Sequence, residues 1–356
     1  MKKVLYLTVK VVPYRTKFFN EWSKYCDLTV AYETGKSGFR DSKWANSEEL
    51  KHKTIFLDES RRVSAYVRLF RLLWGDWDAI VVGCCNIGME RIAVLFLRLM
   101  HIPFILNFDG ESFFEGNTIR AKLKRWFVKG AKLYLIAGEQ SKKSLEKFVK
   151  APVIPYYFSS LYKREIRFLP IDMSDRKSFV LVVGQYLYCK GLDVILKVAL
   201  RDSSIKYKFV GMGVRQDLFM KDYDADVSKA SNVEFIPFLQ KKELEEEYKK
   251  CALLVLPSRQ ECWGLVINES ASFGTPIVST YGSGAAVEFL QNDYPQYLVK
   301  PGDEESLYKA IKLCLLESTK EYSNFLIDKA EKYTIEKMVE CHNRALKCMD
   351  FDVNKV

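Results

Sequence analysis

The sequence predicts an α/β protein with two doubly wound domains, each a parallel β-sheet with helices on both faces. The length of 356 residues corresponds to two domains, since a domain holds roughly 100–200 residues. Short apolar segments alternate with longer amphipathic ones, which is the pattern of repeated βαβ units. The alternation lapses between residues 151 and 177, where Pro152, Pro155 and Pro170 stand among many charges. We interpret this stretch as the connection between the domains.

The N-terminal half contains strand-like segments that are short and rich in Val, Ile, Leu and Phe, as strands buried on both faces are. These segments are Val4–Val9, Leu28–Ala31, Thr54–Leu57, Ala79–Val82, Phe104–Phe108 and Leu133–Ala137. Helices are expected between them at Phe18–Tyr25, Val63–Leu73, Glu90–Met100, Ile119–Lys129 and Gln140–Val149. We therefore expect a first Rossmann-like domain over residues 1–165.

A second alternating series follows the connection. Its expected strands are Phe179–Val183, Lys206–Val210, Val233–Ile236, Leu253–Leu256, Ile277–Ser279 and Tyr297–Val299. Its expected helices include Leu192–Leu200, Lys242–Lys250, Leu265–Ser272, Glu304–Leu316 and Ile335–Met349. We expect a second Rossmann-like domain over residues 166–335, and a final helix over 336–356 that can pack back on the first domain. Ligands of such sheets bind outside the carboxyl ends of the strands.

The composition excludes several classes of protein. Nine scattered cysteines form neither a disulfide framework nor a CxxC pair, which fits a reducing cytosol. Three histidines without clustered ligands disfavour a zinc site. The most apolar stretch, residues 79–100, is interrupted by Glu90 and Arg91, so a membrane-spanning helix is not expected. We expect a cytoplasmic protein.

Charge is unevenly distributed along the chain. Residues 1–170 carry a net charge of +13, whereas residues 171–356 carry −3. One interpretation is that an anionic surface or substrate docks on the first half. The alternative, equally favoured, is that the basic residues only solvate helix faces.

The most informative segment runs from residue 253 to 279, where a strand, a loop and a helix follow one another. The expected strand ends at Pro257, and the loop 259–264 leads into a helix that begins at Leu265. A helix N-terminus presents free backbone N–H groups and the positive end of the helix dipole, which favour a diphosphate. The segment therefore suits a phosphorylated ligand.

Three residues in this segment, Glu261, Gly264 and Glu269, each have a property that suits ligand binding. Gly264 lets the backbone approach a ligand closely. Helical side chains tilt toward the helix N-terminus, so Glu269 can reach back to the mouth of the site. Because a carboxylate is repelled by a diphosphate, Glu261 and Glu269 are expected to accept hydrogen bonds from sugar hydroxyls.

The pair Glu261 and Glu269 resembles the signature of the family 4 retaining glycosyltransferases, which have the GT-B fold. Three other segments resemble that family in the same order: Val183–Gly191, Phe209–Gly213, and Val233–Phe238 followed by Leu244 and Tyr248. The match covers about residues 178–316. The resemblance implies two Rossmann-like domains facing across a cleft, the first binding an acceptor and the second a nucleotide sugar.

The N-terminal half resembles a bacterial subgroup that builds capsular and surface polysaccharides. Residues 12–21, with Pro13, Tyr14 and Arg15, are similar to the opening of that subgroup, and so is the segment Asn107–Glu111. The resemblance implies transfer of a sugar from a nucleotide-sugar donor to a glycan or a polyisoprenyl-linked saccharide. Uridine diphosphate is the expected nucleotide, because it is frequent in the family.

The resemblance also implies a set of donor-site residues. The set is Gly184, Gln185, Lys190, Gly211, Gly213, Ile236, Phe238, Glu261, Trp263, Gly264, Leu265, Val266 and Glu269. By resemblance, Lys190 holds the diphosphate, Glu261 the transferred sugar and Glu269 the ribose. Positions 264–266 contribute backbone contacts, and the main chain near residues 236–238 contacts the base.

One position departs from the family pattern. Gln185 stands where the family has an arginine, and an amide can donate a hydrogen bond but cannot neutralise a phosphate charge. The remaining cationic contribution would come from Lys190 and from an N-terminal arginine such as Arg15. The alternative for Lys190 is a solvated loop lysine.

Acceptor-side residues are less clear in the sequence. Many relatives have a histidine near the sugar, but His52, His101 and His342 are the only histidines here, and none is assigned that role. Asp109 and Glu111 follow a predicted strand at its carboxyl end, and we expect them to be the acceptor-side catalytic groups. The alternative is that Asp109 and Gly110 form only a turn.

The resemblance implies a metal-independent, retaining mechanism. The nucleotide diphosphate leaves through an oxocarbenium-like state, and its oxygen helps to deprotonate the incoming hydroxyl. Backbone N–H groups, the helix dipole and Lys190 stabilise the developing charge. The Asp-x-Asp spacing of residues 222–224 lies in a polar stretch, which we interpret as a surface loop. No metal cofactor is expected.

Two cationic, amphipathic stretches indicate where the acceptor could lie. Residues 61–74 and 120–127 combine Arg and Lys with Leu, Phe and Trp, and such helices can lie on an anionic membrane surface. A peripheral position on the inner face of the cell membrane is therefore a hypothesis. The alternative is ordinary packing of each helix on its own sheet.

Three other functions remain open. A nucleotide-sugar epimerase of the same fold would need acid and base groups beside the sugar, and no histidine is placed for that. A catalytically weak nucleotide-sugar-binding module is favoured by Gln185 and by the absent histidine. A nucleic-acid binder is not expected, because the sequence has no recognition signature beyond its charge.

Overall fold

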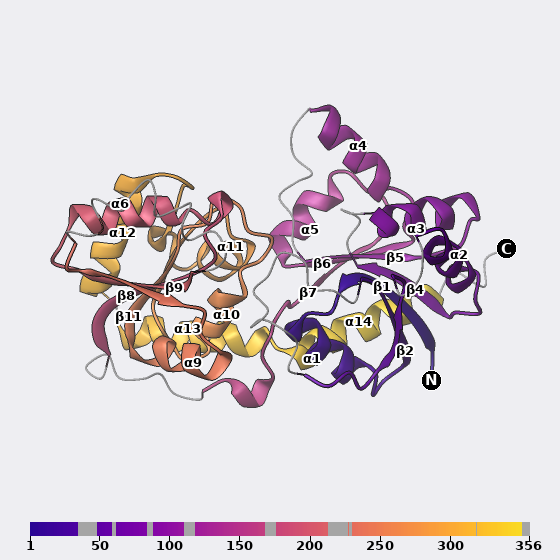
Figure 1. Ribbon diagram of the computed structural model, residues 1–356, viewed down its shortest axis with the longest axis horizontal. Helices are drawn as coiled ribbons and strands as arrows, with labels where there is room; N and C mark the ends of the chain where they lie inside the picture. Colours follow the sequence, from indigo (N-terminus) through magenta and orange to yellow (C-terminus); the bar gives the residue numbers. More distant parts are fainter. Residues whose placement is uncertain are drawn as a thin grey trace. The chain divides into compact units, whose positions relative to one another are not determined.

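The chain forms two α/β units, each built on a wholly parallel sheet (Figure 1). The computed structural model describes residues 1–34, 48–58, 62–83, 88–109, 118–167, 176–212, 227, 230–317 and 319–350. The N-terminal unit comprises Met1–Ser160 and Thr334–Val356, and the C-terminal unit comprises Leu161–Tyr333. The predicted α/β class with two doubly wound domains is confirmed.

The N-terminal sheet has seven strands in the order β3-β2-β1-β4-β5-β6-β7. Their bounds are Lys3–Lys10 (β1), Asp27–Thr34 (β2), Lys53–Phe56 (β3), Ala79–Gly83 (β4), Ile105–Phe108 (β5), Leu133–Ala137 (β6) and Val153–Tyr156 (β7). The order reverses at β1, which pairs with both β2 and β4. Such a reversal is where ligands of doubly wound sheets bind, at the carboxyl ends of the strands.

The edge strand β7 was not among the predicted strands. Its Pro155 cannot donate a hydrogen bond to a neighbouring strand, so proline in a strand pattern argues against a central strand. Here Pro155 pairs with Ile136 of β6 on one side only, because β7 ends the sheet. Proline is tolerated at such an edge.

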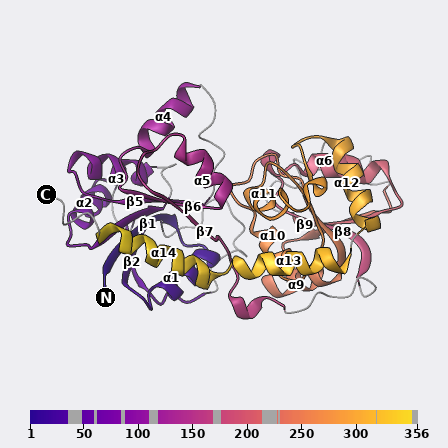
Figure 2. The same cartoon turned by 180° about the vertical axis from the view of Figure 1, so that it is seen from behind.

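The described residues of the N-terminal unit form six helices. They are α1 (Pro13–Trp22), α2 (Arg62–Leu73), α3 (Gly88–Leu99), α4 (Ile119–Val128), α5 (Glu139–Glu146) and α14 (Ile335–Asp350). Pro13 occupies the first turn of α1, where its missing N–H is not needed. The C-terminal helix α14 lies beside α1 (Figure 2), and the rings of His342 and Phe18 are 4.6 Å apart between centroids.

The C-terminal sheet has six strands in the order β10-β9-β8-β11-β12-β13. Their bounds are Lys177–Val183 (β8), Lys206–Met212 (β9), Val233–Pro237 (β10), Cys251–Leu256 (β11), Ile277–Thr280 (β12) and Leu298–Val299 (β13). The helices among the described residues of this unit are α6 (Leu192–Arg201), α9 (Lys241–Lys250), α10 (Leu265–Ala271), α11 (Gly284–Leu290), α12 (Glu304–Glu317) and α13 (Lys320–Lys332). The strand order of this sheet reverses between β8 and β11. We call this position, at the carboxyl ends of the strands, the switch point of the sheet, and the loops that follow β8 and β11 both lie there.

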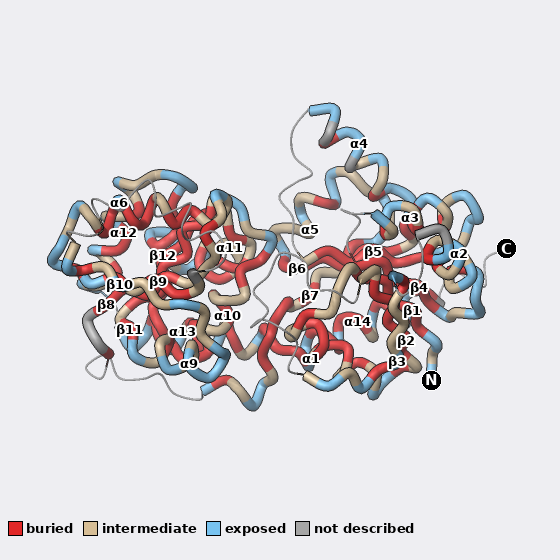
Figure 3. Tube along the Cα trace, viewed as in Figure 1, coloured by how far each residue is buried: buried red, intermediate tan, exposed pale blue. Residues whose placement is uncertain are grey.

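Buried residues concentrate in the strands of both units (Figure 3). Every residue of β4, β5 and β6 is buried, as expected of parallel strands covered on both faces. None of the helices formed by the described residues is both long and apolar enough to cross a membrane.

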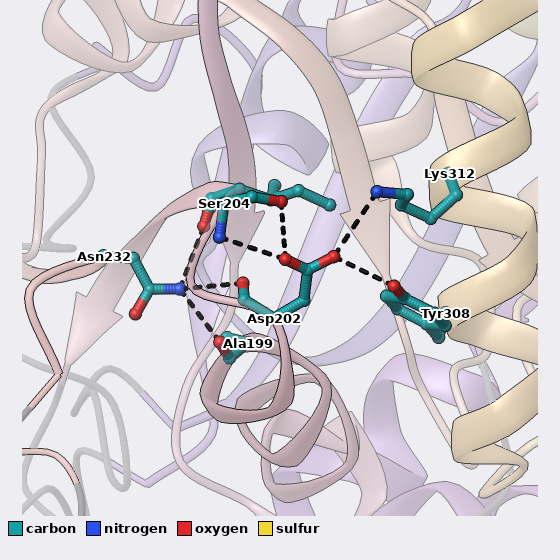
Figure 4. Close-up of polar contacts among 7 residues, drawn as sticks. Ala199, Asp202, Ser204, Asn232, Tyr308 and Lys312 are labelled. Carbon is teal, nitrogen blue, oxygen red and sulfur yellow. Dashed lines mark hydrogen bonds and ion pairs between the residues drawn. The ribbon is translucent and has the colours of Figure 1, made fainter.

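A polar network joins the end of α6 to the residues that precede β9 and to Tyr308 of α12 (Figure 4). The Asn232 side chain donates to Ala199 O at 2.9 Å and to Asp202 O at 3.2 Å, which are carbonyls at the end of α6, and to Ile205 O at 2.9 Å, just before β9. Asp202 accepts from Ser204 and from the Tyr308 hydroxyl, and the Ser204 hydrogen bonds lower the pKa of Asp202. The network fixes α6, whose opposite end begins at the switch point.

The packing of α14 on the N-terminal unit predicts a stability difference between two positions of that helix. Met338 is fully buried, so Met338→Ala should lower the free energy of unfolding of the N-terminal unit by about 2–5 kcal/mol. Arg344 is exposed on the same helix, and Arg344→Ala should change it by less than about 0.5 kcal/mol. Denaturant unfolding of both variants measures the difference, and equal effects would contradict the packing.

Candidate functional site

The candidate donor site lies at the switch point of the C-terminal unit. One loop follows β8, contains a short 3-10 turn at Tyr188–Lys190, and enters α6 through Gly191, whose φ is 66°. The other follows β11 and enters α10 through Gly264, whose φ is 103°. An L-residue with a side chain rarely adopts such a φ, so both helix entries require glycine.

The two loops are bound tightly to each other. The backbone N–H groups of Arg259 and Gln260 both donate to Cys189 O, at 2.8 and 3.0 Å. A β carbon at position 191 would lie 2.1 Å from Pro257 O, so the approach excludes any other residue there. The Lys190 backbone is thereby fixed beside the loop that carries Glu261.

The guanidinium of Arg259 reinforces the junction. It donates to both carboxylate oxygens of Asp193 at 2.6 Å, a bidentate geometry that is strong and directional. It also lies over the Tyr188 ring, 4.2 Å from the centroid. The Arg259 charge therefore serves the junction between the loops.

The side chains of Lys190 and Glu261 meet in this site. Lys190 Nζ donates to Glu261 Oε2, and the two side chains are 24% and 18% exposed. The Glu261 backbone N–H donates to Gly282 O at 2.8 Å, and the Ser258 hydroxyl lies 3.4 Å from Glu261 Oε2. The structure thus brings together Lys190, which the family resemblance assigns to the diphosphate, and Glu261, which it assigns to the transferred sugar.

Glu269 lies one helical turn into α10. Its Oε2 atom accepts from the Tyr248 hydroxyl at 3.1 Å, and Glu269 itself is half-buried. Tyr248 is buried, and its burial, followed by the nearby Glu269 carboxylate, raises the pKa of the phenol well above its usual value. Tyr248 therefore stays neutral and donates, which fixes the direction of the Glu269 carboxylate.

Trp263 occupies a different environment from the other residues predicted in this loop. Its side chain is 2% exposed, the indole N–H donates to Asn268 Oδ1 at 2.9 Å, and the ring packs on Tyr333. This side chain therefore serves the packing of the C-terminal unit. Leu265 and Val266 are half-buried on the first turn of α10.

The predicted glycine turns meet at the end of β8 and β9. Gly184 donates its backbone N–H to Val210 O at 3.0 Å, and a β carbon at Gly211 would lie 2.9 Å from Gly184 O. Gln185, the departure from the family pattern, is half-buried in the same turn. Gly213 lies outside the described residues.

The predicted base-contact residues end the edge strand of this sheet. Ile236 is the residue at which the β9–β10 register shifts, and such an irregularity redirects the chain at a strand end. Phe238 follows β10, and both side chains are half-buried.

In the N-terminal unit, the buried Arg15 forms an ion pair with the half-buried Asp109. Arg15 Nη2 donates to Asp109 Oδ2 at 2.5 Å and Nη1 donates to the Tyr6 hydroxyl at 2.7 Å. The Tyr156 hydroxyl donates to Asp109 Oδ1 at 2.8 Å. Burial opposes the charge of Arg15, but Asp109 raises its pKa well above the usual value. Glu111, the other predicted acceptor-side residue, lies outside the described residues.

His342 is part of this buried network, although sequence reasoning gave it no role. Its Nε2 atom lies 2.9 Å from Asn107 Oδ1, and its Nδ1 atom lies 2.7 Å from Met338 O. Burial lowers the pKa of His342 to about 3, so the imidazole is neutral. No local motif marks the residue, because it reaches Asn107 from α14 across 235 positions of sequence.

Among the residues that the structure describes, no group of three or more His, Cys, Asp or Glu side chains is placed to hold a metal ion. The described residues of the C-terminal switch point include Lys190, the carboxylates of Glu261 and Glu269, and the backbone groups of two glycine-containing loops.

Comparison with known proteins finds similarity over the unit that carries this site. Residues 165–333, which make up most of the C-terminal unit, match the family "Glycosyl transferases group 1". An uncharacterised glycosyltransferase of Methanocaldococcus jannaschii is 26% identical over 228 residues, which cover 62% of this chain and 60% of that protein. The O-antigen chain mannosyltransferase C of Escherichia coli is 29% identical over 137 residues, 38% of this chain and 36% of that one. The chain spans less than two thirds of the length of these curated relatives.

A solved structure resembles the whole chain. The crystal structure of Anabaena Alr3699/HepE in complex with UDP and glucose aligns with 98% of this chain and 100% of its own. The TM-score is 0.72 and the sequence identity is 14%. At that identity the likeness shows the fold alone, and it confirms the predicted GT-B class.

The close approach at Gly191 predicts a large difference between two glycine substitutions. Gly302 has a φ of 81° with nothing within 4 Å of an added β carbon, so Gly302→Ala should destabilise by only about 1–2 kcal/mol. Gly191→Ala adds overlap with Pro257 O and should destabilise the C-terminal unit by about 3 kcal/mol or more. Thermal or denaturant unfolding compares the two, and equal losses would show that the loops can separate.

Proposed function

We propose that the protein is a family 4 retaining glycosyltransferase that moves a hexose from a uridine diphosphate sugar to a glycan or a lipid-linked saccharide during bacterial surface polysaccharide synthesis. The observation that carries the proposal is the meeting of Lys190 and Glu261 at the switch point of a unit that matches the family "Glycosyl transferases group 1". Similarity to the O-antigen chain mannosyltransferase C of Escherichia coli and to the HepE complex with UDP and glucose supports the acceptor class and the nucleotide.

In this proposal Lys190 provides the main cation for the diphosphate. Arg15 is paired with Asp109 within the N-terminal unit, so its charge is already balanced. Gln185 cannot replace the family arginine as a charge. The backbone N–H groups that follow Gly184 and Gly264 supply the remaining donors.

The carboxylates orient the sugar and the ribose. Glu261 is fixed through its backbone and its contact with Lys190, and it accepts hydrogen bonds from hydroxyls of the transferred sugar. Glu269, directed by Tyr248, accepts from the ribose. Because both acceptors are fixed before binding, little reorganisation accompanies the reaction.

The transfer itself proceeds on the face from which the nucleotide diphosphate departs. The bond from the anomeric carbon to the diphosphate oxygen breaks, and the acceptor oxygen bonds to that carbon on the same face. The acceptor proton passes to the departing diphosphate oxygen. Lys190 and the backbone donors stabilise the developing charge without a metal, so chelators should leave the rate unchanged.

A second candidate is a nucleotide-sugar-binding module with little or no transfer. Gln185 favours it, because a weaker hold on the diphosphate would slow departure of the leaving group. The two functions differ in turnover: a transferase releases nucleotide faster when an acceptor is present, whereas a module binds the nucleotide without release.

A membrane role follows from a patch on the N-terminal unit, which we define as Leu99 on α3 with Ile119, Leu123 and Trp126 on α4. These side chains are between 49% and 86% exposed, and Arg98 lies over the Trp126 ring at 4.6 Å. Lys122 and Lys129 are exposed beside them. Exposed apolar and basic side chains on adjacent helices suit an anionic bilayer, which would place the protein on the inner face of the cell membrane.

Removal of the Glu261 carboxylate should separate transfer from folding. Glu261→Ala should lower kcat/KM for acceptor-dependent nucleotide release by about 100-fold or more, because the sugar loses an oriented acceptor in the transition state. Glu246→Gln, an exposed carboxylate of the same unit, is the matched control and should leave the rate unchanged. An unchanged rate in Glu261→Ala would remove this residue from the mechanism.

A thermal-shift screen with UDP, GDP and their sugars accompanies the assay. A ligand at about 100 times its Kd stabilises the native state by about 2.7 kcal/mol, so the cognate nucleotide should stand out in wild type and in Glu261→Ala. A larger shift with GDP would contradict the uridine assignment.

The membrane proposal predicts the behaviour of a double variant of α4. Wild type should float with vesicles that contain phosphatidylglycerol at low salt, and Leu123→Glu with Trp126→Glu should reduce the bound fraction at least about tenfold, since each buried apolar side chain contributes about 1.5–3 kcal/mol. Leu316→Glu, at an exposed apolar position of the C-terminal unit, should bind as wild type does. Absence of wild-type binding at low salt would overturn the proposal.

A further inference from the structure

Arg176, the residue that precedes β8, is a buried cation of the C-terminal unit. It is 7% exposed, and its hydrogen bonds go to carbonyl and hydroxyl oxygens. Within the described part of the chain no carboxylate is paired with it, and its Nε atom has no hydrogen-bond partner. Arginine is rarely buried without an acidic partner, so the contacts of this residue need an explanation.

The guanidinium group of Arg176 lies between the ends of two helices. Its Nη1 atom donates to Tyr248 O at 3.1 Å, Lys249 O at 3.4 Å and Cys251 O at 3.1 Å, carbonyls at and just after the end of α9. Its Nη2 atom donates to Phe273 O at 2.9 Å, two residues after α10 ends. The last carbonyls of a helix lack partners within the helix and carry the negative end of its dipole, so a cation suits this place.

Thr275 completes this junction between the helix ends. Its hydroxyl accepts from Arg176 Nη1 at 3.0 Å and donates to Tyr248 O at 2.6 Å. The Tyr248 ring stacks on the Phe273 ring, with the centroids 6.4 Å apart. Thr275 and Tyr248 are 0% and 1% exposed, so water does not compete for these hydrogen bonds. Arg176 and Thr275 therefore fix the backbone of Tyr248 relative to the end of α10.

The hydroxyl end of Tyr248 reaches the candidate donor site, where it donates to Glu269 Oε2 at 3.1 Å. Tyr248 belongs to α9 and Glu269 to α10, so this hydrogen bond depends on how the two helices are placed relative to each other. Arg176 joins the ends of the same two helices. A change at Arg176 is therefore expected to alter the direction of the Glu269 carboxylate.

The charge of Arg176 adds more to geometry than to stability. Burial lowers the pKa of Arg176 from its usual value, because burial disfavours the charged form. An arginine still keeps its proton at neutral pH, so the carbonyls meet a full charge. Desolvation of that charge costs free energy that an apolar side chain of similar volume would avoid. Charge-assisted hydrogen bonds are directional, and this property explains the contacts better than stability does.

We propose that Arg176 and Thr275 are positioning residues for the ribose of the nucleotide sugar, which act through Tyr248 on Glu269. The inference rests on the glycosyltransferase function proposed above, in which Glu269 accepts a hydrogen bond from the ribose. It adds the residues that give this contact its direction. Both act from inside the C-terminal unit, and neither takes part in bond breaking.

Calorimetric measurement of nucleotide binding to the full chain tests the proposal. The probes are UDP and its 2′-deoxy and 3′-deoxy counterparts, and the readout is the Kd of the weaker deoxy analogue divided by the Kd of UDP. In wild type this ratio should be at least about ten, because a site built for a hydroxyl rejects a ligand that lacks it. Arg176→Met and Thr275→Val should each lower the ratio at least about threefold, since the hydrogen bond to the ribose loses its alignment.

The ratio separates positioning from a purely structural role, which would weaken UDP and the deoxy analogues equally. Arg176→Lys keeps a cation that can meet the carbonyls bound by Nη1, so its ratio should lie between those of Arg176→Met and wild type. Thr275→Val keeps the shape of the side chain and gives the same readout if Arg176→Met does not fold. Arg201→Met, at an exposed arginine of the same unit, is the control and should keep the wild-type ratio within about twofold.

A double variant tests whether Arg176 acts through Glu269. Arg176→Met should weaken UDP binding less in the Glu269→Ala background than in wild type, because changes along one chain of contacts are not additive. Equal losses in the two backgrounds would mean that Arg176 acts elsewhere, and would overturn the proposal.

The outcomes distinguish this inference from the proposed function. An unchanged ratio in Arg176→Met and Thr275→Val would overturn the inference, and so would a wild type that binds UDP without distinguishing the deoxy analogues; either result leaves the proposed transfer intact. If GDP is the cognate nucleotide, the same ratios are measured with GDP and its deoxy counterparts. A wild type that binds neither nucleotide would overturn the proposed function and the inference with it.

Discussion

The packing of two loops against each other at the carboxyl edge of the C-terminal sheet is the constraint on which the candidate donor site depends. The loops leave β8 and β11, the strands on either side of the reversal in sheet order. Only a residue without a β carbon fits at 191, because Pro257 O lies where that carbon would be. Two backbone hydrogen bonds to Cys189 O hold the same approach. The position of Lys190 follows from this contact, since its neighbour is the packed glycine and its side chain reaches Glu261.

The ion pair at the candidate donor site and the ion pair of the N-terminal unit differ in how far the cation is buried. In the C-terminal unit, the Lys190–Glu261 pair is partly exposed, so a ligand can exchange with either partner at modest cost in desolvation. In the N-terminal unit, Arg15 is buried and paired with Asp109, with Tyr6 and Tyr156 completing the hydrogen bonds. Removing one partner of such a pair leaves an uncompensated buried charge, so the pair fixes α1 against β5. Arg15 is committed there, and no other described residue forms an ion pair with Glu33 or Glu90.

The sequence predicted those parts of the structure that depend on local pattern. Apolar runs located β4 and β11, and the loop 259–264 was placed correctly between β11 and α10, because periodicity and turn residues act over a few positions. The edge strand β7 was missed because Pro155 argues against a strand unless its edge position is known. Long-range partners were not predictable: neither the Arg15–Asp109 pair nor the approach of His342 to Asn107 leaves a local signal. Trp263 shows the same limit, since a motif cannot tell whether a ring faces a ligand or the core.

The charge distribution of the N-terminal unit also constrains how an acceptor could bind under the membrane proposal. The unit is basic in sequence, with exposed lysines beside the apolar patch on α3 and α4, whereas Glu33 and Glu90 lie at the carboxyl edge of its sheet. An anionic lipid phosphate is attracted to the basic helices and repelled by the Glu33–Glu90 pair. Under the membrane proposal, the basic helices would therefore take the phosphate of a lipid-linked saccharide, because like charges would meet at the sheet edge.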